Sequence, residues 1–542
     1  MDEISGLMKR GLWSYVLALL VFLFVGLGTY SNVINAFFLS DDFVLIAAVK
    51  DNGAFGLWSH DRGEFFRPLI SLSLFADSKL WGLNPLGHHV TNLVVHSLNS
   101  VLVSVTCYLL IRKARIFTND LQILPLLSGL AFLLLASHTE AVTWISGRTD
   151  VIATFFGLFS FGTYLLYRQC SRRPLFLFSA VLFICALLSK ESVITYPFVI
   201  LAYELYVYVM WKRQSTELVN ALRMPLVHFA LVGVYFLARL VATGSLVGAG
   251  YLSDRYLRLS LWSILKNLIK YPARVLMPPV AIGKLTVFAF LISMVMLFVT
   301  SALKSVRKGS GKGEDRATWL LLCFLMIAFL MTVLPVLSLQ IATMNTGGER
   351  FLYWPSAFVC ILITTLLRFA VASQRRFVLL SCCLLVLSSI SLYRVNETWR
   401  TGGQISKQLI EDIVALPKAD TVLITNLPEV IVGVPVYRAG QIEGVRLFCG
   451  DSQFSNIVAL AHHNIFSEGD GIVVQQSRDG YSVQLLAPGT RFWYFAGSPS
   501  IPEHLDIVVT DVTATAFKVQ VKGLTKHDHL LFYSAGNLHR VE

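Results

Sequence analysis

The sequence is poor in charged residues. Asp, Glu, Lys and Arg make up 14% of its 542 residues, 55% are hydrophobic, and the mean hydropathy is +0.64. Soluble domains carry roughly 25% charged residues. The composition therefore excludes an ordinary soluble protein and favours a membrane protein.

Three other features are missing. Most of the eight cysteines fall inside apolar stretches, and no Cys/His spacing fits zinc, which excludes a disulfide framework and a zinc site of that kind. The sequence has no glycine-rich phosphate loop, so we expect no nucleotide cofactor. It also has no tandem repeat, which excludes a solenoid.

What the sequence does contain is long apolar runs. Residues 12–27, 151–167, 285–300 and 319–337 carry no charge. About 20 apolar residues cross a bilayer as a helix, and runs this continuous do not alternate as barrel strands do. We count about 11 transmembrane helices, beginning near residues 12, 90, 121, 150, 175, 192, 225, 281, 318, 351 and 377. The first is expected to be a retained anchor.

The basic residues indicate an orientation. Lys and Arg occupy every second loop, at 112–115, 168–173, 212–223, 304–316 and 368–376. Because such loops stay in the cytoplasm, we expect a cytoplasmic N-terminus. This bias explains most of the net charge of +12 without a nucleic-acid partner. An odd number of spans then places the C-terminal region outside, in the periplasm or extracellular space.

Two domains are expected. Residues 1–393 form the transmembrane domain, with a first outer loop at 38–87 and an amphipathic interfacial helix at about 253–275, which either rests in the interface or contacts anionic headgroups. Residues 394–542 form a soluble α/β or mostly-β domain, with a helix at 397–416 and strands at 421–425, 430–437, 471–475, 482–486, 492–496, 507–512 and 516–521. This domain either recognises an acceptor or serves as a structural cap.

Ionisable residues gather on the predicted outer side. They are Asp41 and Asp42; Asp61, Arg62, Glu64 and Arg67; His88 and His89; His138, Glu140, Arg148 and Asp150; Lys190 and Glu191; Glu349 and Arg350. Charges at membrane depth are expensive and mark function. A transporter more often places them near the midplane of broken helices. The one-sided cluster therefore favours a site open to the outer leaflet.

Each group has a chemical and a structural interpretation. The Asp41-Asp42 pair suits a general base, but Asp42 also suits a helix N-cap. Arg148 can grip a phosphate with two hydrogen bonds, with Glu140 or Asp150 to orient it, or can belong to an interfacial salt-bridge network. The Lys190-Glu191 and Glu349-Arg350 pairs are either site residues or local ion pairs.

Several motifs resemble one family. The segments 67–69 (RPL), 80–96 (LWGLNPLGHHVTNLVVH), 138–150 (HTEAVTWISGRTD), 189–192 (SKES) and 349–356 (ERFLYWPS) are similar in order and spacing to the membrane region of the tetratricopeptide-containing O-mannosyltransferases. These are polyprenyl-phosphate-sugar glycosyltransferases of the GT-C type. The resemblance covers roughly residues 12–390. No tetratricopeptide array follows, which suggests a bacterial relative with another acceptor.

The resemblance implies a reaction and assigns roles to residues. A hexose such as mannose moves from a polyprenyl-phosphate carrier to an acceptor hydroxyl, with inversion. Asp41 or Asp42 is the catalytic base. Arg148, Lys190, Arg67, Arg350 and His138 bind the donor and its phosphate. His88, His89, Glu140, Asp150, Glu191 and Glu349 support them.

Partners, cofactors and rivals complete the prediction. The partners are the lipid-linked donor, membrane lipids and an acceptor that is a glycan, a lipid or a protein. No cofactor is required, although a divalent metal is possible at Asp41/Asp42. We expect the inner (plasma) membrane of a bacterium. The alternatives are a protein O-mannosyltransferase, a transporter or flippase of lipid-linked glycans, and a non-catalytic scaffold.

Overall fold

A computed structural model describes residues 2–57, 65–211, 215–246, 260–277, 313–342, 345–450, 453–465, 471–477, 480–495 and 503–541. The chain folds into two compact units. Unit 1 comprises Met1–Ile34, Ala54–Leu80 and Gly87–Val395, and unit 2 comprises Asn35–Gly53, Trp81–Leu86 and Asn396–Glu542. The expected residues Asp61, Arg62 and Glu64 lie outside the described part.

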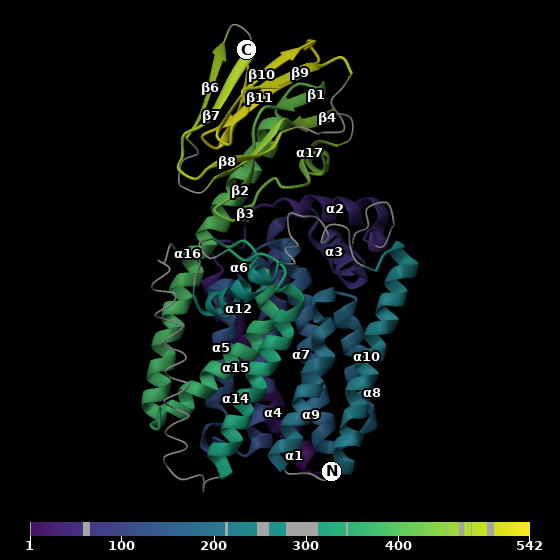
Figure 1. The fold of residues 1–542 in the computed structure, drawn as a ribbon, viewed down its shortest axis with the longest axis vertical. Helices are drawn as coiled ribbons and strands as arrows, with labels where there is room; N and C mark the ends of the chain where they lie inside the picture. The colour runs from purple at the N-terminus through teal and green to yellow at the C-terminus, as the bar shows by residue number, and fades with distance from the viewer. Residues whose placement is uncertain are drawn as a thin grey trace. The chain divides into compact units, whose positions relative to one another are not determined.

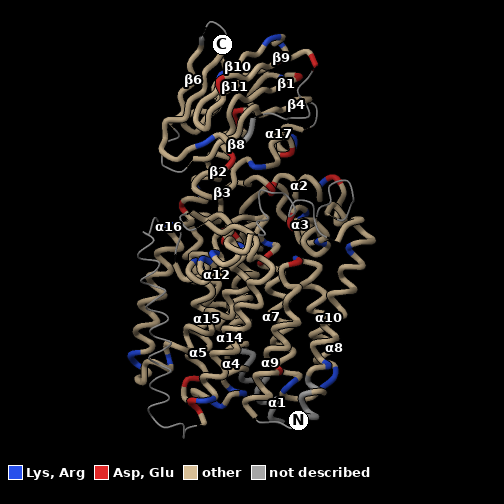
Figure 2. The backbone as a smooth tube through the Cα atoms, viewed as in Figure 1, with Lys and Arg blue, Asp and Glu red and all other residues tan. Residues whose placement is uncertain are grey.

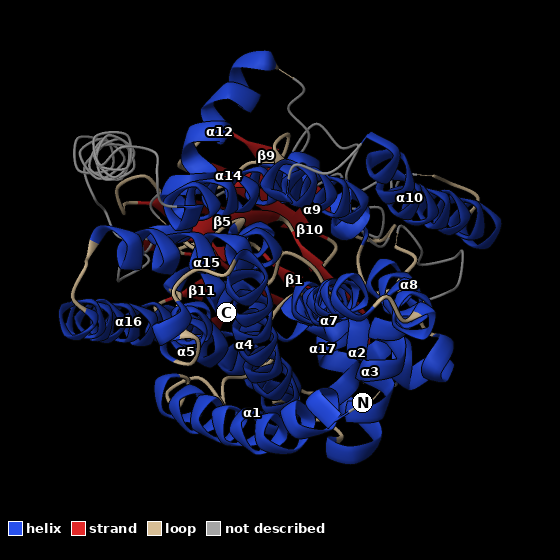
Figure 3. Cartoon of the chain, turned by 90° about the horizontal axis from the view of Figure 1, so that it is seen from below, coloured by secondary structure: helices blue, strands red, loops and turns tan. Residues whose placement is uncertain are grey.

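Unit 1 is a helical bundle (Figure 1). Its helices are α1 (Asp2–Thr29), α3 (Pro68–Trp81), α4 (Pro85–Ala114), α5 (Ile123–Leu133), α6 (Thr139–Val142), α7 (Arg148–Cys170), α8 (Arg173–Leu187), α9 (Tyr196–Trp211), α10 (Ser215–Thr243), α12 (Leu261–Leu276), α14 (Gly313–Val333), α15 (Tyr353–Ala370) and the first part of α16 (Gln374–Val414). Helix α7 packs on α8 and α15, and α14 packs on α9 and α15. Figure 3 shows this central group end-on.

The helices confirm a polytopic membrane fold. Within the described residues, seven are long and apolar enough to cross a membrane, and α5 with its bent continuation makes an eighth. Two shorter apolar helices, Val16–Thr29 and Arg173–Leu187, occupy two further predicted positions. The span predicted near residue 281 lies outside the described residues. The described residues thus place an apolar helix at ten of the 11 predicted positions.

The motif at 138–150 begins where one span is broken. Helix α5 and the segment Ala136–Val142 are bent by 53°. The side-chain amide of Asn92 donates to the carbonyls of Val142 and Trp144, at 3.1 and 3.2 Å. Broken backbone at membrane depth requires such buried partners. Gly147 closes the turn, because a Cβ there would lie 2.4 Å from the carbonyl oxygen of Glu140.

Helix α12 matches part of the predicted interfacial helix, whose first residues lie outside the described part. The side chains of Leu261, Trp262 and Ile269 are exposed, whereas Asn267 and Arg274 are buried. The amide of Asn267 donates to the carbonyls that follow α14 at residues 337 and 339. The helix therefore buries Asn267 and Arg274 against the protein and exposes Leu261, Trp262 and Ile269, and its place in the membrane interface stays a prediction.

Unit 2 carries the sheets. Its helices are α2 (Asp41–Asn52), the rest of α16 and α17 (Gln441–Cys449); its strands are β1 (Ala419–Ile424), β2 (Leu427–Ile431), β3 (Val434–Pro435), β4 (Phe454–Ala459), β5 (Ala461–Ile465), β6 (Ile472–Ser477), β7 (Gly480–Leu485), β8 (Arg491–Phe495), β9 (Asp506–Thr510), β10 (Ala516–Lys522), β11 (Asp528–Ser534) and β12 (Asn537–Arg540). The three sheets have the orders β12-β11-β1-β4, β6-β7-β10-β9 and β3-β2-β5-β8.

Local chemistry explains two details of this unit. Strand β1 pairs in parallel with both β11 and β4, and its burial suits an apolar central strand. The single strand predicted at 430–437 is wrong. Val432 and Gly433 have φ angles of 47° and 89°, so the chain turns there and β2 pairs antiparallel with β3.

The segment with the Asp pair packs within unit 2. Helix α2 contacts α17. The N–H of Ser40 donates to the carbonyl of Val436 at 2.9 Å, and the ring of Phe43 stacks on Tyr437 with centroids 5.9 Å apart. The hydroxyl of Ser406 on α16 donates to the carbonyl of Phe38 at 2.7 Å. The start of the predicted outer loop is thus held by residues of the C-terminal region.

Candidate functional site

The charged residues of unit 1 lie mainly at the two ends of its helices, with a mostly uncharged stretch between (Figure 2). One end holds five ion pairs, which we call the site end: Arg67–Glu191, Arg148–Asp77, Lys190–Asp150, Arg274–Glu349 and Arg350–Glu140. Glu140 lies in α6, and Glu349 and Arg350 lie just before α15. Paired charges are the form in which ions are tolerated in such a setting.

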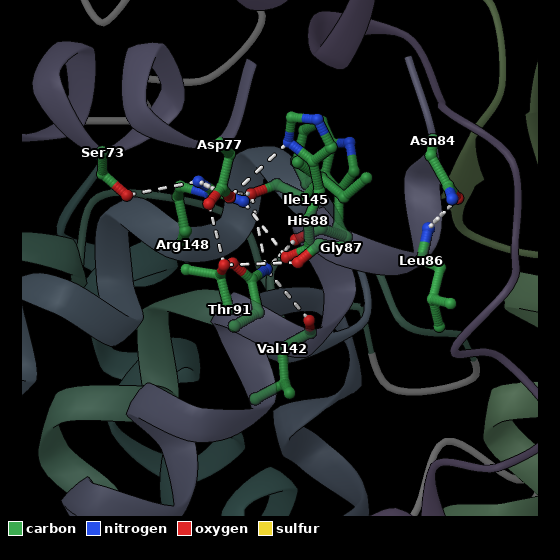
Figure 4. A network of polar contacts seen from close by, with 12 residues as sticks. Ser73, Asp77, Asn84, Leu86, Gly87, His88, Thr91, Val142, Ile145 and Arg148 are labelled. Atoms are coloured by element: carbon green, nitrogen blue, oxygen red, sulfur yellow. Dashed lines mark hydrogen bonds and ion pairs between the residues drawn. The ribbon is translucent and has the colours of Figure 1, made fainter. Parts of the chain in front are cut away.

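Arg148 is the most enclosed of these cations (Figure 4). Its side chain is 1% exposed, and Nη1 lies 2.7 Å from Oδ2 of Asp77. The guanidinium also donates to the hydroxyl of Ser73 at 3.2 Å and to the carbonyls of His88 and Ile145 at 3.1 and 3.4 Å. With each guanidinium nitrogen engaged, Arg148 ties α3 and α4 to the start of α7.

Asp77 joins this network but was missed in the sequence. The hydroxyl of Thr91 donates to its Oδ1 at 2.8 Å, and Nδ1 of the buried His88 lies 3.6 Å from its Oδ2. The available signal was an isolated carboxylate in the apolar stretch of α3. The neighbouring His89 is buried as well and lines a cavity of about 10 Å³ with Tyr30 and Thr143.

Lys190 and Glu191 are adjacent in sequence but pair with different partners. Lys190 is extended, with φ −161°, and a 3-10 turn, η6 (Glu191–Thr195), begins immediately after it. The ammonium of Lys190 binds Oδ2 of Asp150, whereas Glu191 receives two hydrogen bonds from Arg67, at 2.7 and 3.2 Å. The local ion pair considered from sequence is therefore not what forms.

The other cations of the site end affect the pKa of Lys190. Burial lowers the pKa of its ammonium to about 8; Asp150 opposes this effect, and Arg350 and Arg67 reinforce it. A positive charge nearby disfavours the charged form of an amine and so lowers its pKa. The Nζ atom also lies 5.7 Å from the ring centroid of Phe351. Arg67, Lys190 and Arg350 therefore lie near enough to interact electrostatically, and each is paired with its own carboxylate.

Glu349 and Arg350 also point to different partners. Gly348 turns the chain with φ 86°, and a Cβ there would lie 2.7 Å from the carbonyl oxygen of Gln340. Glu349 is buried against Arg274 and accepts from Thr139 at 3.3 Å. The backbone N–H of Arg350 donates to Oε2 of Glu140 at 2.9 Å.

Arg350 and Arg67 are the more accessible cations. The side chain of Arg350 is 23% exposed and that of Arg67 is 12% exposed. The guanidinium of Arg350 lies 5.0 Å from the ring centroid of Trp144, and that of Arg67 lies 4.2 Å from Phe65. Planar cations held on aromatic rings in this way can still meet a phosphate edge-on.

Arg274 was not predicted as a site residue. It reaches from α12 to Glu349 and donates to the carbonyl of Ala342 at 3.0 Å. Burial lowers its pKa to about 10, and Glu140 partly offsets that effect. The only sequence signal was its place at the end of the amphipathic segment.

His138 lies in a different setting from the predicted donor site. It is fully buried, and its Nε2 is 2.7 Å from the hydroxyl of Ser356. The rings of Phe132, His96 and Tyr353 surround it, with centroids 4.5, 5.4 and 4.6 Å away. Its contacts join α5, α4 and α15 as part of the bundle core.

The two predicted bases, both in unit 2, differ in accessibility. Asp42 is buried, and its Oδ2 accepts the N–H of Leu39 at 2.9 Å. Asp41 is 35% exposed; its Oδ2 is 3.0 Å from Nη2 of Arg438, and its Oδ1 accepts the hydroxyl of Ser40 at 3.2 Å. Asp42 thus secures the first turn of α2, while Asp41 keeps an accessible carboxylate.

A metal at this pair stays a prediction. Across the described ranges, no group of three or more His, Cys, Asp and Glu side chains is arranged to hold a metal ion. The Asp41 carboxylate already meets a cation, the guanidinium of Arg438. A divalent ion there would have to compete with it.

Comparisons with known proteins confirm the resemblance. No protein-family model matches the chain. It is 34% identical over 161 residues to Protein O-mannosyl-transferase TMTC1 of Mus musculus, covering 28% of this chain and 16% of that protein. It is 29% identical over 211 residues to TMTC2 of Homo sapiens, covering 34% and 23%. The chain thus spans less than a quarter of the length of these two relatives.

Two solved structures are also similar. One is ArnT from Cupriavidus metallidurans bound to undecaprenyl phosphate, at 11% identity and a TM-score of 0.49, covering 81% of this chain and 85% of that one. The other is the archaeal oligosaccharyltransferase AglB from Archaeoglobus fulgidus in complex with an inhibitory peptide and a dolichol-phosphate. There the identity is 11% and the TM-score 0.44, covering 86% and 66%.

Proposed function

We propose that this chain is a membrane glycosyltransferase that moves a hexose such as mannose from a polyprenyl-phosphate carrier to an acceptor hydroxyl, with inversion. The observation that carries the proposal is the cluster of Arg67, Lys190 and Arg350 at one end of an apolar helical bundle. A lipid-linked phosphate needs both an apolar phase for its chain and cations for its headgroup. The names of the curated relatives agree with this chemistry.

The cations act on the leaving group. When the bond between the anomeric carbon and the phosphate oxygen breaks, the lipid phosphate takes the electron pair and gains negative charge. Fixed positive groups stabilise that charge, and such preorganisation is worth several kcal/mol. We assign the contact to Arg350 and Arg67, which are the more exposed, with Lys190 supplying charge behind them.

The base acts on the acceptor. We assign the role of base to Asp41, whose carboxylate is accessible. Asp42 instead stabilises the first turn of α2. Asp41 takes the proton from the acceptor hydroxyl as its oxygen attacks the anomeric carbon on the face opposite the phosphate. A single displacement of this kind inverts the centre.

The remaining predicted residues position the others. Asp150 and Glu191 orient Lys190 and Arg67, and Glu140 holds the backbone of Arg350. Arg148 holds the start of α7 in place, because its guanidinium meets Asp77 and the carbonyl of His88. Glu349 fixes Arg274, while His89 and His138 pack in the core.

The acceptor class and the membrane side are also proposals. Protein O-mannosyl transfer is the second candidate, because the curated relatives carry that name. We place the site on the extracytoplasmic face of a bacterial inner membrane, with a cytoplasmic N-terminus. A flippase or a non-catalytic scaffold is the rival reading.

The direct test uses purified full-length protein. Radiolabelled polyprenyl-phosphate mannose is supplied with membrane extract as the source of acceptors, and transfer is compared for wild type, Asp41→Asn and Arg350→Gln. We expect wild type to transfer label and both variants to lose most of it. If the labelled donor binds to the protein but no extract accepts the mannose from it, the flippase or scaffold alternative would be favoured.

The candidate span Glu349–Ala370, which begins beside Arg350, supplies a matched control. Arg368, in the last turn of α15, pairs with Asp120 at 2.8 Å, at the end opposite Arg350. Asp120 keeps a second partner, the amide of Gln374 at 2.9 Å. Arg368→Gln therefore removes one arginine from the same candidate span, Glu349–Ala370, and should leave transfer unchanged. Equal losses in Arg350→Gln and Arg368→Gln would count against a donor contact at Arg350.

A further inference from the structure

The C-terminal region forms hydrogen bonds with the backbone next to Asp41. Residues 436–440, which we call the strap, run beside residues 39–43 within unit 2. The N–H of Ser40 donates to the carbonyl of Val436 at 2.9 Å, and the N–H of Ala439 donates to the hydroxyl of Ser40 at 3.2 Å. The ring of Tyr437 stacks on Phe43 with an interplanar angle of 9°.

The close approach depends on one glycine of the strap. Gly440 has φ 81°, a conformation that residues with a Cβ rarely adopt. A Cβ at this position would lie 2.6 Å from the carbonyl oxygen of Ser40 and 3.0 Å from the Cβ of Phe43. The glycine thus permits both the turn and the contact.

The residue before Asp41 has an unusual conformation. Ser40 has φ 46° and ψ −112°, and it is buried. A non-glycine residue with such angles persists only where its surroundings over-determine it, and such residues cluster at functional sites. Here the surroundings include two hydrogen bonds between Ser40 and the strap, one donated by the N–H of Ser40 and one by the N–H of Ala439. They fix the direction in which the Asp41 side chain leaves the backbone.

The strap also supplies a partner for the carboxylate. Nη2 of Arg438 lies 3.0 Å from Oδ2 of Asp41, and the hydroxyl of Ser40 donates to Oδ1 at 3.2 Å. The same hydroxyl oxygen accepts the N–H of Ala439. Each carboxylate oxygen thus has one fixed donor, yet the side chains of Arg438 and Asp41 are 26% and 35% exposed. Space remains for an acceptor hydroxyl.

We infer that Arg438 is a positioning residue for the general base, and that the strap makes the C-terminal region part of the catalytic apparatus. This inference rests on the proposed function. A base must lie within hydrogen-bond reach of the proton it removes, and a misplacement of about 1 Å can cost about 100-fold in rate. Arg438 does not take the proton. It holds the carboxylate so that a lone pair faces the acceptor.

The test separates positioning from binding. In full-length protein, Arg438→Gln should lower kcat by about 10-fold or more and leave the KM for polyprenyl-phosphate mannose unchanged, because the donor meets other residues. Arg438→Lys, which keeps the charge, should recover part of the rate. In an Asp41→Asn background, Arg438→Gln should cause no further loss. An unchanged kcat, or losses that add fully with those of Asp41→Asn, would overturn the inference.

A control variant guards against a general effect. Arg400→Gln removes an exposed arginine of the same unit, from an ion pair with Glu397 on α16. It should behave as wild type. A loss in Arg400→Gln equal to that in Arg438→Gln would mean that removing any surface charge disturbs this unit.

A second readout does not depend on transfer. Hydrogen exchange of the amides at residues 40–44 should be faster in Arg438→Gln than in wild type, and unchanged in Arg400→Gln. If wild type fails to transfer sugar, the proposed function fails. The exchange result still reports whether Arg438 stabilises the contact between the strap and residues 39–43. If wild type transfers and exchange is unchanged in Arg438→Gln, the inference alone fails.

Discussion

Lys190 gives the sharpest pH prediction. Its pKa is lowered to about 8 by burial, with Asp150 opposing and Arg350 and Arg67 reinforcing. A lysine is cationic below its pKa, so raising the pH through 8 removes a positive charge from the donor site. With this value about 90% of the side chains are charged at pH 7 and about 10% at pH 9. Transfer that needs the charge should fall about ninefold.

The assay is the initial rate of transfer at subsaturating donor between pH 7 and 9. The matched variant is Lys190→Arg, because a guanidinium stays charged throughout this range. We expect the decline in wild type to disappear in Lys190→Arg, whatever the absolute rate of that variant. Lys190→Met should be slow and flat across the same range.

Two results would refute the reasoning. A wild-type rate that stays constant from pH 7 to 9 would mean that Lys190 keeps its proton or that its charge does not matter. An equal decline in wild type and Lys190→Arg would assign the titration to another group. Circular dichroism at each pH serves as the check that the fold persists.

Three further predictions concern stability and function. Asp77→Ala leaves the buried guanidinium of Arg148 without its carboxylate, which should cost about 3–5 kcal/mol in thermal unfolding in detergent; a loss below about 1 kcal/mol would refute the role of the pair. Asp42→Asn weakens the acceptor for Leu39 N–H and should lower the stability by about 1 kcal/mol, whereas Asp41→Asn should lose most of the transfer at unchanged melting temperature; the reverse pattern would exchange their roles. Gly147→Ala places a methyl group 2.4 Å from a carbonyl oxygen and should cost about 1–3 kcal/mol, so a wild-type melting temperature would contradict the tight turn.

The sequence predicted what is encoded locally. Each described apolar span follows from a continuous run of residues that a bilayer forces into a helix. The strands at 516–521 and 482–486 were found because β-branched or alternating residues lie between turn residues, and both appear as β10 and β7. The strand at 430–437 was predicted too long because the turn contains Val432, a residue that rarely adopts a positive φ.

What the sequence could not supply was the pairing of charges. Arg438 and Asp41 are 397 residues apart, and no local pattern relates them. Lys190 and Glu191 are neighbours whose local pairing was the simpler interpretation, yet each binds a residue from a distant part of the sequence. Asp77 lies in the segment predicted as the first outer loop, and Arg274 lies in the predicted amphipathic helix. Such partners follow only from the packing of the helices.

The separation of these partners along the chain has a consequence for biosynthesis. Glu140 meets Arg350 only after 210 further residues, and Arg67 meets Glu191 after 124. At about 5–20 residues per second, the ribosome needs about 10–40 s to deliver the partner of Glu140. Until then Glu140 lacks the backbone donor and the guanidinium that it contacts in the folded protein, so this part of the site end can be completed only late in synthesis.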